Sequence, residues 1–93
     1  MEIKREGNIL YVYGNIKSLE DFEIIKAELD SIKKMYDNII INLIDSISIT
    51  SSVIGYLNKL VDEGINITIK VKEDLYDLFD ELGLVSLFNI RKL

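Results

Sequence analysis

Apolar residues recur along this chain with two periods, one typical of helices and one typical of strands. Three segments repeat their apolar residues at three- and four-residue spacing, which predicts three amphipathic helices. The first follows Ser18, a favourable N-cap residue, and the other two end at Gly64 and Gly83, where left-handed C-terminal residues are common. The apolar positions are Leu19, Phe22, Ile25, Leu29 and Ile32 in the first, Val53, Ile54, Leu57, Leu60 and Val61 in the second, and Leu75, Leu78, Phe79 and Leu82 in the third.

Between the helices lie segments with the composition and period of strands. Residues 2–13 predict a hairpin that turns at Glu6-Gly7-Asn8, with charged Lys4, Arg5 and Glu6 protecting an exposed edge. Residues 38–43 are almost continuously apolar, which favours a central strand covered on both faces, as in a parallel sheet. Residues 65–71 alternate between apolar and polar, which favours a strand with one buried face. Residues 87–90 fit either a last short strand or a docking tail.

The order of these elements is ββαβαβα with a short apolar end. Strands that alternate with helices predict an α/β domain with a mixed, mostly parallel sheet of four to five strands packed by α-helices. At 93 residues the chain is long enough for one hydrophobic core, so we assign residues 1–93 to a single domain. We expect six residues to be almost fully buried: Ile39, Ile41, Leu57, Leu60, Ile67 and Leu78.

Composition narrows the range of functions. The chain contains no cysteine and no histidine, so disulfides, thiolate nucleophiles, imidazole bases and the usual zinc ligands are excluded. A net charge of −5 and the lack of a basic stripe argue against nucleic-acid binding. No apolar run approaches the length of a bilayer-spanning helix, and the N-terminus does not resemble a secretory signal. We therefore expect a cytoplasmic protein that is not integral to a membrane and needs no cofactor.

Catalytic interpretations of the remaining polar residues are weak. Ser51 would need a nearby base to act as a nucleophile, and Lys59 lies two helical turns away. Asp77, Asp80 and Glu81 lack the spacing of a calcium loop and fit the solvated face of a helix. The sequence predicts a protein that is not an enzyme and that binds a partner.

Two groups of residues allow both a structural and a functional interpretation. Thr50-Ser51-Ser52 precedes an apolar helix, where hydroxyls commonly cap free N–H groups, but a phosphate or a partner contact at Ser51 is compatible with capping. Tyr11 and Tyr13 share one face of their strand. That face is either half-buried packing, which we favour, or a partner-binding surface.

The segment from Ile40 to Gly55 contains a buried strand that ends in Asn42-Leu43, a loop, and then Asp45-Ser46-Ile47-Ser48-Ile49-Thr50-Ser51-Ser52 before a helix. This pattern resembles the central signature of STAS domains, in particular those of anti-sigma factor antagonists. Similarity continues through Glu63-Gly64 and the alternating strand to the helix that ends at Gly83-Leu84, so it covers nearly the whole chain.

The resemblance implies a regulatory module that binds an anti-sigma factor of the serine-kinase type and is released when that kinase phosphorylates it. Ser51 aligns with the phosphorylated serine, whereas Thr50 and Val53 stand where the family usually has aspartate and glycine. The implied contact surface consists of Ile49, Thr50, Ser51, Ser52, Val53, Ile54 and Gly55. An alternative with the same fold is an accessory subunit of an ABC-type lipid transporter or a part of a stress-signalling assembly, without phosphorylation. The identity of the partner and the oligomeric state are left open.

Overall fold

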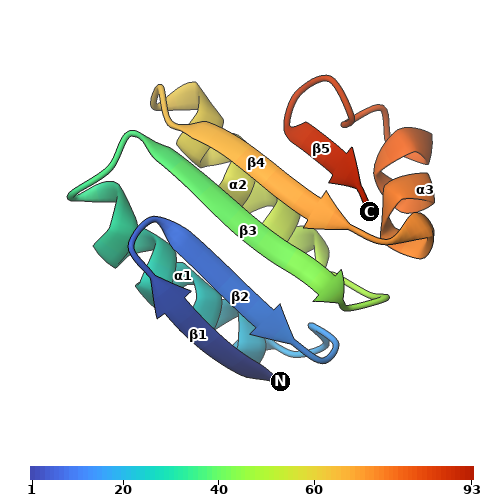
Figure 1. The fold of residues 1–93 in the computed structure, drawn as a ribbon, viewed down its shortest axis with the longest axis horizontal. Helices are drawn as coiled ribbons and strands as arrows, with labels where there is room; N and C mark the ends of the chain where they lie inside the picture. The colour runs from blue at the N-terminus through green and yellow to red at the C-terminus, as the bar shows by residue number, and fades with distance from the viewer.

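Five strands form a single sheet whose spatial order follows the order of the sequence, β1-β2-β3-β4-β5 (Figure 1). The computed structural model describes all residues from Met1 to Leu93. Its elements are β1 (Glu2–Glu6), β2 (Ile9–Tyr13), α1 (Leu19–Lys33), β3 (Asn38–Asp45), α2 (Ser51–Asp62), β4 (Asn66–Val71), α3 (Glu73–Glu81) and β5 (Asn89–Lys92). The predicted α/β fold and element order are confirmed. A fifth strand forms at Asn89–Lys92, shifted by two residues from the predicted segment 87–90.

The sheet is mixed in the predicted way. β1 pairs antiparallel with β2, and the β2–β3, β3–β4 and β4–β5 pairs are all parallel. Both α1 and α2 lie behind the sheet in Figure 1, and α3 stands beside β5. None of the helices combines the length and the apolar character needed to span a bilayer.

The first helix begins where the sequence places its cap. Ser18 accepts a hydrogen bond from the N–H of Asp21, and the Asp21 carboxylate accepts from the N–H groups of Lys17 (2.9 Å) and Ser18 (3.3 Å). These bonds form a capping box, which satisfies N–H groups that an α-helix leaves free at its start. The bond from the Lys17 N–H, together with that from Ser18, lowers the pKa of Asp21 because it stabilises the charged carboxylate.

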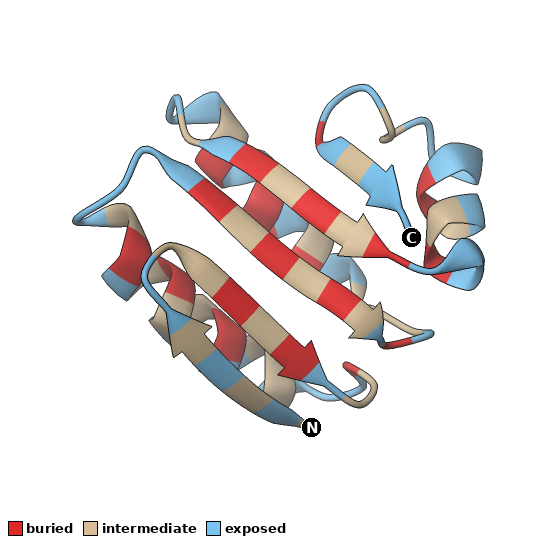
Figure 2. Ribbon diagram, in the orientation of Figure 1, coloured by how far each residue is buried: buried red, intermediate tan, exposed pale blue.

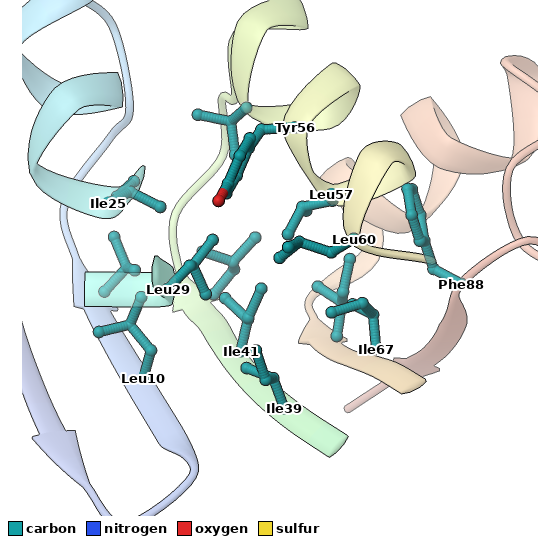
Figure 3. Packing of buried hydrophobic residues seen from close by; sticks show 14 of the residues in the cluster. Leu10, Ile25, Leu29, Ile39, Ile41, Tyr56, Leu57, Leu60, Ile67 and Phe88 are labelled. Carbon is teal, nitrogen blue, oxygen red and sulfur yellow. The ribbon is translucent and has the colours of Figure 1, made fainter. Parts of the chain in front are cut away.

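The hydrophobic core fills the space between the sheet and the two long helices (Figure 3). Five of the six residues predicted to be buried lie in it: Ile39, Ile41, Leu57, Leu60 and Ile67. The prediction for Leu78 is wrong, because this side chain is only half-buried. Leu75 and Phe79 occupy the inward face of α3, where Phe79 meets Phe88 edge-to-face at 6.2 Å between ring centroids. Leu78 is therefore displaced to the flank of the helix.

The other face of the sheet is covered by no helix. Along β3 and β4 buried residues alternate with half-buried ones (Figure 2), so every second residue belongs to the face turned away from the helices. β3 is central in the sheet, as predicted. The prediction that both faces of β3 are covered is wrong for the chain by itself. Tyr11 and Tyr13 lie on this open face and stack on each other, with centroids 6.5 Å apart and planes 7° from parallel.

Candidate functional site at the start of α2

The segment from the end of β3 to the start of α2 is fastened to the loop between β2 and α1. The Asp45 carboxylate accepts a hydrogen bond from the N–H of Gly14 at 2.9 Å, and the Ser46 hydroxyl donates to the Gly14 carbonyl at 2.6 Å. Gly14 has φ +90°, a conformation that glycine adopts most easily. Ser46 is the only buried polar residue, and this bond satisfies its hydroxyl.

Three further hydrogen bonds continue the contact between the same two loops. The N–H of Ile47 donates to the Asn15 side-chain carbonyl at 2.9 Å. The N–H of Ile16 donates to the Ser48 carbonyl at 3.3 Å, and the Ser48 hydroxyl donates to the Ile16 carbonyl at 3.4 Å. Because each of residues 45–48 makes a hydrogen bond to the opposite loop through its backbone or its side chain, the start of α2 has a defined position at the carboxyl end of β3.

Thr50, not a serine, caps the helix. Its backbone is extended (φ −90°, ψ 154°), and its hydroxyl accepts from the N–H of Val53 at 3.4 Å. Ser51 and Ser52 are the first two residues of α2, both are exposed, and neither side chain makes a hydrogen bond within the chain. The capping interpretation of the polar run thus applies to Thr50, and the two serine hydroxyls are available to other molecules.

We expect Thr50→Ala to lower the free energy of unfolding by about 1 kcal/mol, because it removes the acceptor for one N–H of the first turn. Ser51→Ala is the matched control and should change the stability little, since the Ser51 hydroxyl has no partner in the fold. Urea unfolding followed by circular dichroism measures both. Equal losses for the two variants would contradict the assignment of the cap to Thr50.

The seven predicted contact residues differ in how far their side chains are exposed. Ser51, Ser52 and Gly55 are exposed, while Ile49, Thr50 and Ile54 are half-buried. The Val53 side chain is only 3% exposed and belongs to the core, so it is not available to a partner. The bulk of valine at this position therefore points inward and does not obstruct an approach to the helix.

One apolar residue of this surface was missed by the sequence reasoning. Ile47 lies in the loop before α2 and is 62% exposed. The sequence held no signal for it, because the alternation Ser46-Ile47-Ser48-Ile49 favours a buried Ile47, whereas the structure buries Ser46 and exposes Ile47. Ile47 therefore adds an exposed apolar side chain to the loop that leads into the candidate surface.

Gly55 lies in the middle of α2, where glycine is unfavourable by roughly 0.5–1 kcal/mol relative to alanine. Its φ is not positive, and a Cβ atom built there would meet nothing within 4 Å. Neither the backbone nor the packing of this chain therefore requires glycine. The missing side chain leaves the helix backbone open to close approach from outside.

We expect Gly55→Ala to raise the free energy of unfolding by about 0.5–1 kcal/mol. Gly64→Ala is the control, because Gly64 has φ +92° and an added side chain there is strained. Thermal or chemical unfolding should separate the two variants in opposite directions. A Gly55→Ala variant less stable than the original chain would mean that the fold itself needs this glycine.

The electrostatics at the start of α2 favour an added negative charge. The first turn of the helix contains no acidic residue, so the positive end of its dipole has no charged side chain to offset it. No group of three or more acidic side chains in the structure gathers in a way that could hold a metal ion. The local chemistry is that of exposed hydroxyls on a helix N-terminus.

Tyr56 fixes α2 against α1 below this surface. Its hydroxyl donates to the Asp30 carboxylate, and three lysine ammonium groups lie 5.1–6.0 Å from the centre of its ring. Cation–π attraction of this kind stabilises such contacts by roughly 0.5–1 kcal/mol at exposed sites. The orientation of α2, and with it the direction in which Ser51 points, is therefore set by contacts with α1 as well as by the core.

The single pocket of the molecule lies away from this surface. It has a volume of about 660 Å³ and is lined by the amino ends of β3 and β4, the end of α2 and residues 85–89. Ser51 follows the carboxyl end of β3, so the two features are at opposite ends of the sheet. The candidate site is thus outside the pocket, which suits contact with a macromolecule better than enclosure of a small ligand.

Comparison with models of known protein families returned no match, and neither did comparison with curated protein sequences.

Proposed function

We propose that this protein is a non-catalytic regulatory module that binds a protein partner through the start of α2, in the manner of an anti-sigma factor antagonist. The observation that carries this proposal is the exposed Ser51 hydroxyl, which is the first side chain of α2 and has no role in the cap. A hydroxyl in this position is accessible to a kinase, and its modification leaves every hydrogen bond of the fold intact.

The partner is an anti-sigma factor of the serine-kinase type, as the resemblance of residues 40–55 implies. Its contact surface on this chain comprises Ile47, Ile49, Thr50, Ser51, Ser52, Ile54 and Gly55. Two features support this surface: an exposed isoleucine provides apolar contact, and Gly55 permits the close approach of another backbone. Binding needs no cofactor and takes place in the cytoplasm.

Phosphorylation of Ser51 switches this binding off through local electrostatics. The phosphate adds about −1.5 to −2 charge at neutral pH, and the uncompensated N-terminus of α2 tolerates that charge within the isolated domain. In the complex the same charge would be taken out of water within a surface that contributes no cation of its own. Association therefore weakens although the fold does not change.

The proposal is tested by capture of partners from a lysate of the source cells on four immobilised proteins: the original chain, Ser51→Ala, Ser51→Glu and Ser86→Glu. Ser86 is an exposed loop residue beside the pocket, so Ser86→Glu controls for the added charge. We expect an ATP-binding protein of the serine-kinase class on the original chain, Ser51→Ala and Ser86→Glu, but not on Ser51→Glu.

Identification of the captured proteins by mass spectrometry distinguishes the outcomes. Retention of the same proteins on all four columns would contradict a role for Ser51. Capture of permease and ATPase subunits of a transporter would contradict the proposal of an anti-sigma factor as partner. It would remain compatible with the proposed binding surface.

A further inference from the structure

The edge of β4 that faces β5 is only partly paired. β5 pairs with β4 from Thr68 onward, although β4 begins at Asn66. Asn66 and Ile67 therefore have a strand neighbour on the β3 side only. The chain before β5 does not extend that strand backward, because it forms a turn in which the Phe88 N–H donates to the Leu84 carbonyl at 3.1 Å.

Two backbone groups next to Asn66 point toward this free edge. The Asn66 N–H donates to the Asp37 carbonyl at 2.9 Å and so faces β3. The N–H and C=O of a trans peptide point in opposite directions, so the Ile65 carbonyl faces away from β3. The pairing of Asn66 with Asn38 directs the Asn66 carbonyl toward β3, and the Ile67 N–H therefore also faces away. Neither outward group has a backbone hydrogen-bond partner.

Ile65 and Ile67 both line the pocket, whose volume is about 660 Å³. Ile67 is only 4% exposed, so its N–H lies in a nearly buried position. A buried backbone N–H without a partner costs free energy comparable to a lost hydrogen bond. The wall of the pocket thus carries an unpaired donor and an unpaired acceptor, and the volume of the pocket is typical of ligand sites.

The side chains around the pocket favour a neutral ligand with an apolar and a polar part. None of the eleven lining residues is charged, so a charged ligand would lose water without gaining a counter-charge. Val61 and Ile65 form an apolar wall that packs against the core. Asn38 and Asn66 supply carboxamides, and the Asn66 side chain is exposed.

One residue of an extended peptide that runs parallel to β4 matches both unpaired backbone groups. In a parallel ladder, the residue opposite Asn66 donates its N–H to the Ile65 carbonyl and accepts at its own carbonyl from the Ile67 N–H. Its side chain projects to the same side as that of Asn66, and the side chain before it projects toward the apolar wall. Continued in register, β5 would bring Leu87 to this place, but the turn before β5 holds Leu87 elsewhere.

We propose that this pocket binds a short neutral peptide, which adds to the free edge of β4 in parallel. Its recognised part is an apolar residue followed by a carboxamide residue, and the peptide ends there because β5 begins at Asn89. Strand addition of this kind takes affinity from main-chain hydrogen bonds and specificity from alternate side chains. The pocket and the surface around Ser51 are at opposite ends of the sheet, so both can be occupied together.

Titration of the full chain with N-acetyl-leucyl-asparagine amide, followed in ¹H–¹⁵N spectra, tests the proposal. For a ligand of about 20 non-hydrogen atoms we expect a dissociation constant on the order of 0.1 to 1 mM. The Ile67 amide proton should move downfield and exchange more slowly with water, because it gains an acceptor, while the Ser51 amide should not change. The lack of a saturable change at Ile67 up to about 10 mM would overturn the proposal.

Two altered peptides serve as controls and leave the protein unchanged. Methylation of the asparagine backbone nitrogen removes the N–H that the Ile65 carbonyl accepts, and it should weaken binding at least about tenfold. The free acid in place of the terminal amide should also bind more weakly, because no cation lines the pocket. Equal binding of the methylated peptide would contradict pairing with the edge of β4.

Val85→Trp narrows the pocket from its loop side and should abolish detectable binding of the peptide. Leu82→Trp is the matched control, because Leu82 is 53% exposed at the end of α3 and does not line the pocket. This control should bind as the original chain does. A folded Val85→Trp variant with unaltered affinity would show that the peptide binds elsewhere and would overturn the proposal.

Discussion

Leu57→Ala should lower the free energy of unfolding by about 2–5 kcal/mol. Leu57 is 0% exposed and lies where α2 packs on the sheet, between the labelled side chains of Leu60 and Tyr56 in Figure 3. Its truncation loses the transfer energy of the removed methyl groups and leaves a cavity that the packed helix closes only in part. Because domains of this kind are stable by only about 5–15 kcal/mol, the loss is a large fraction of the total.

Leu19→Ala provides the matched control for this substitution. Leu19 is 71% exposed at the start of α1, so the same chemical change removes little buried surface and should alter stability by less than about 0.5 kcal/mol. Urea unfolding of the two variants and the original chain measures the difference. A similar, small effect at both positions would mean that α2 does not pack on the sheet as described.

Phosphorylation of Ser51 should weaken binding to the proposed partner by at least about 2 kcal/mol, which is roughly a 30-fold rise in the dissociation constant. The reason is that the phosphate must lose water in a surface without a cation to pair with it. The isolated domain should keep its stability or gain about 0.3–1 kcal/mol, since negative charge is favourable at a helix N-terminus. Binding and stability should therefore change independently.

Calorimetry with the purified partner and with unmodified or enzymatically phosphorylated protein tests this expectation. Ser51→Ala is the necessary control, because it removes the hydroxyl without adding charge and should retain most of the affinity. Phosphatase treatment should restore binding. Equal affinities of the two forms would rule out the switch and leave a binding module that is not regulated at Ser51.

The sequence was sufficient for the elements and their order because each depends on local spacing. The period at which apolar residues recur was enough to distinguish α2 from β4, and it identified the buried side chains of β3 and of α2. It failed for Leu78, where the helical pattern offered four apolar residues and Leu75 and Phe79 occupy the inward face, with Phe79 against Phe88. Such a choice depends on tertiary packing, which the local pattern does not contain.

The candidate site was only partly predictable for the same reason. The position of Ser51 at a helix start followed from the sequence, but the cap was assigned to the polar run as a whole and not to Thr50. The bonds of Gly14 to Asp45 and Ser46 join residues 31 and 32 positions apart, so no local pattern could indicate them. The uncovered face of the sheet could not be predicted either, because alternation identifies the two faces of a strand without indicating what covers each one.

The coincidence of strand order and sequence order bears on how the chain is synthesised. Each strand from β2 onward hydrogen-bonds to the strand made just before it, so no strand has to be inserted between two others that are already paired. The sheet can thus grow at one edge as the nascent chain emerges, and each new strand closes the edge left by the last. Chains paused after β3 would present that edge to solvent, and translation through β4 and β5 removes it by adding the next strands of the sheet.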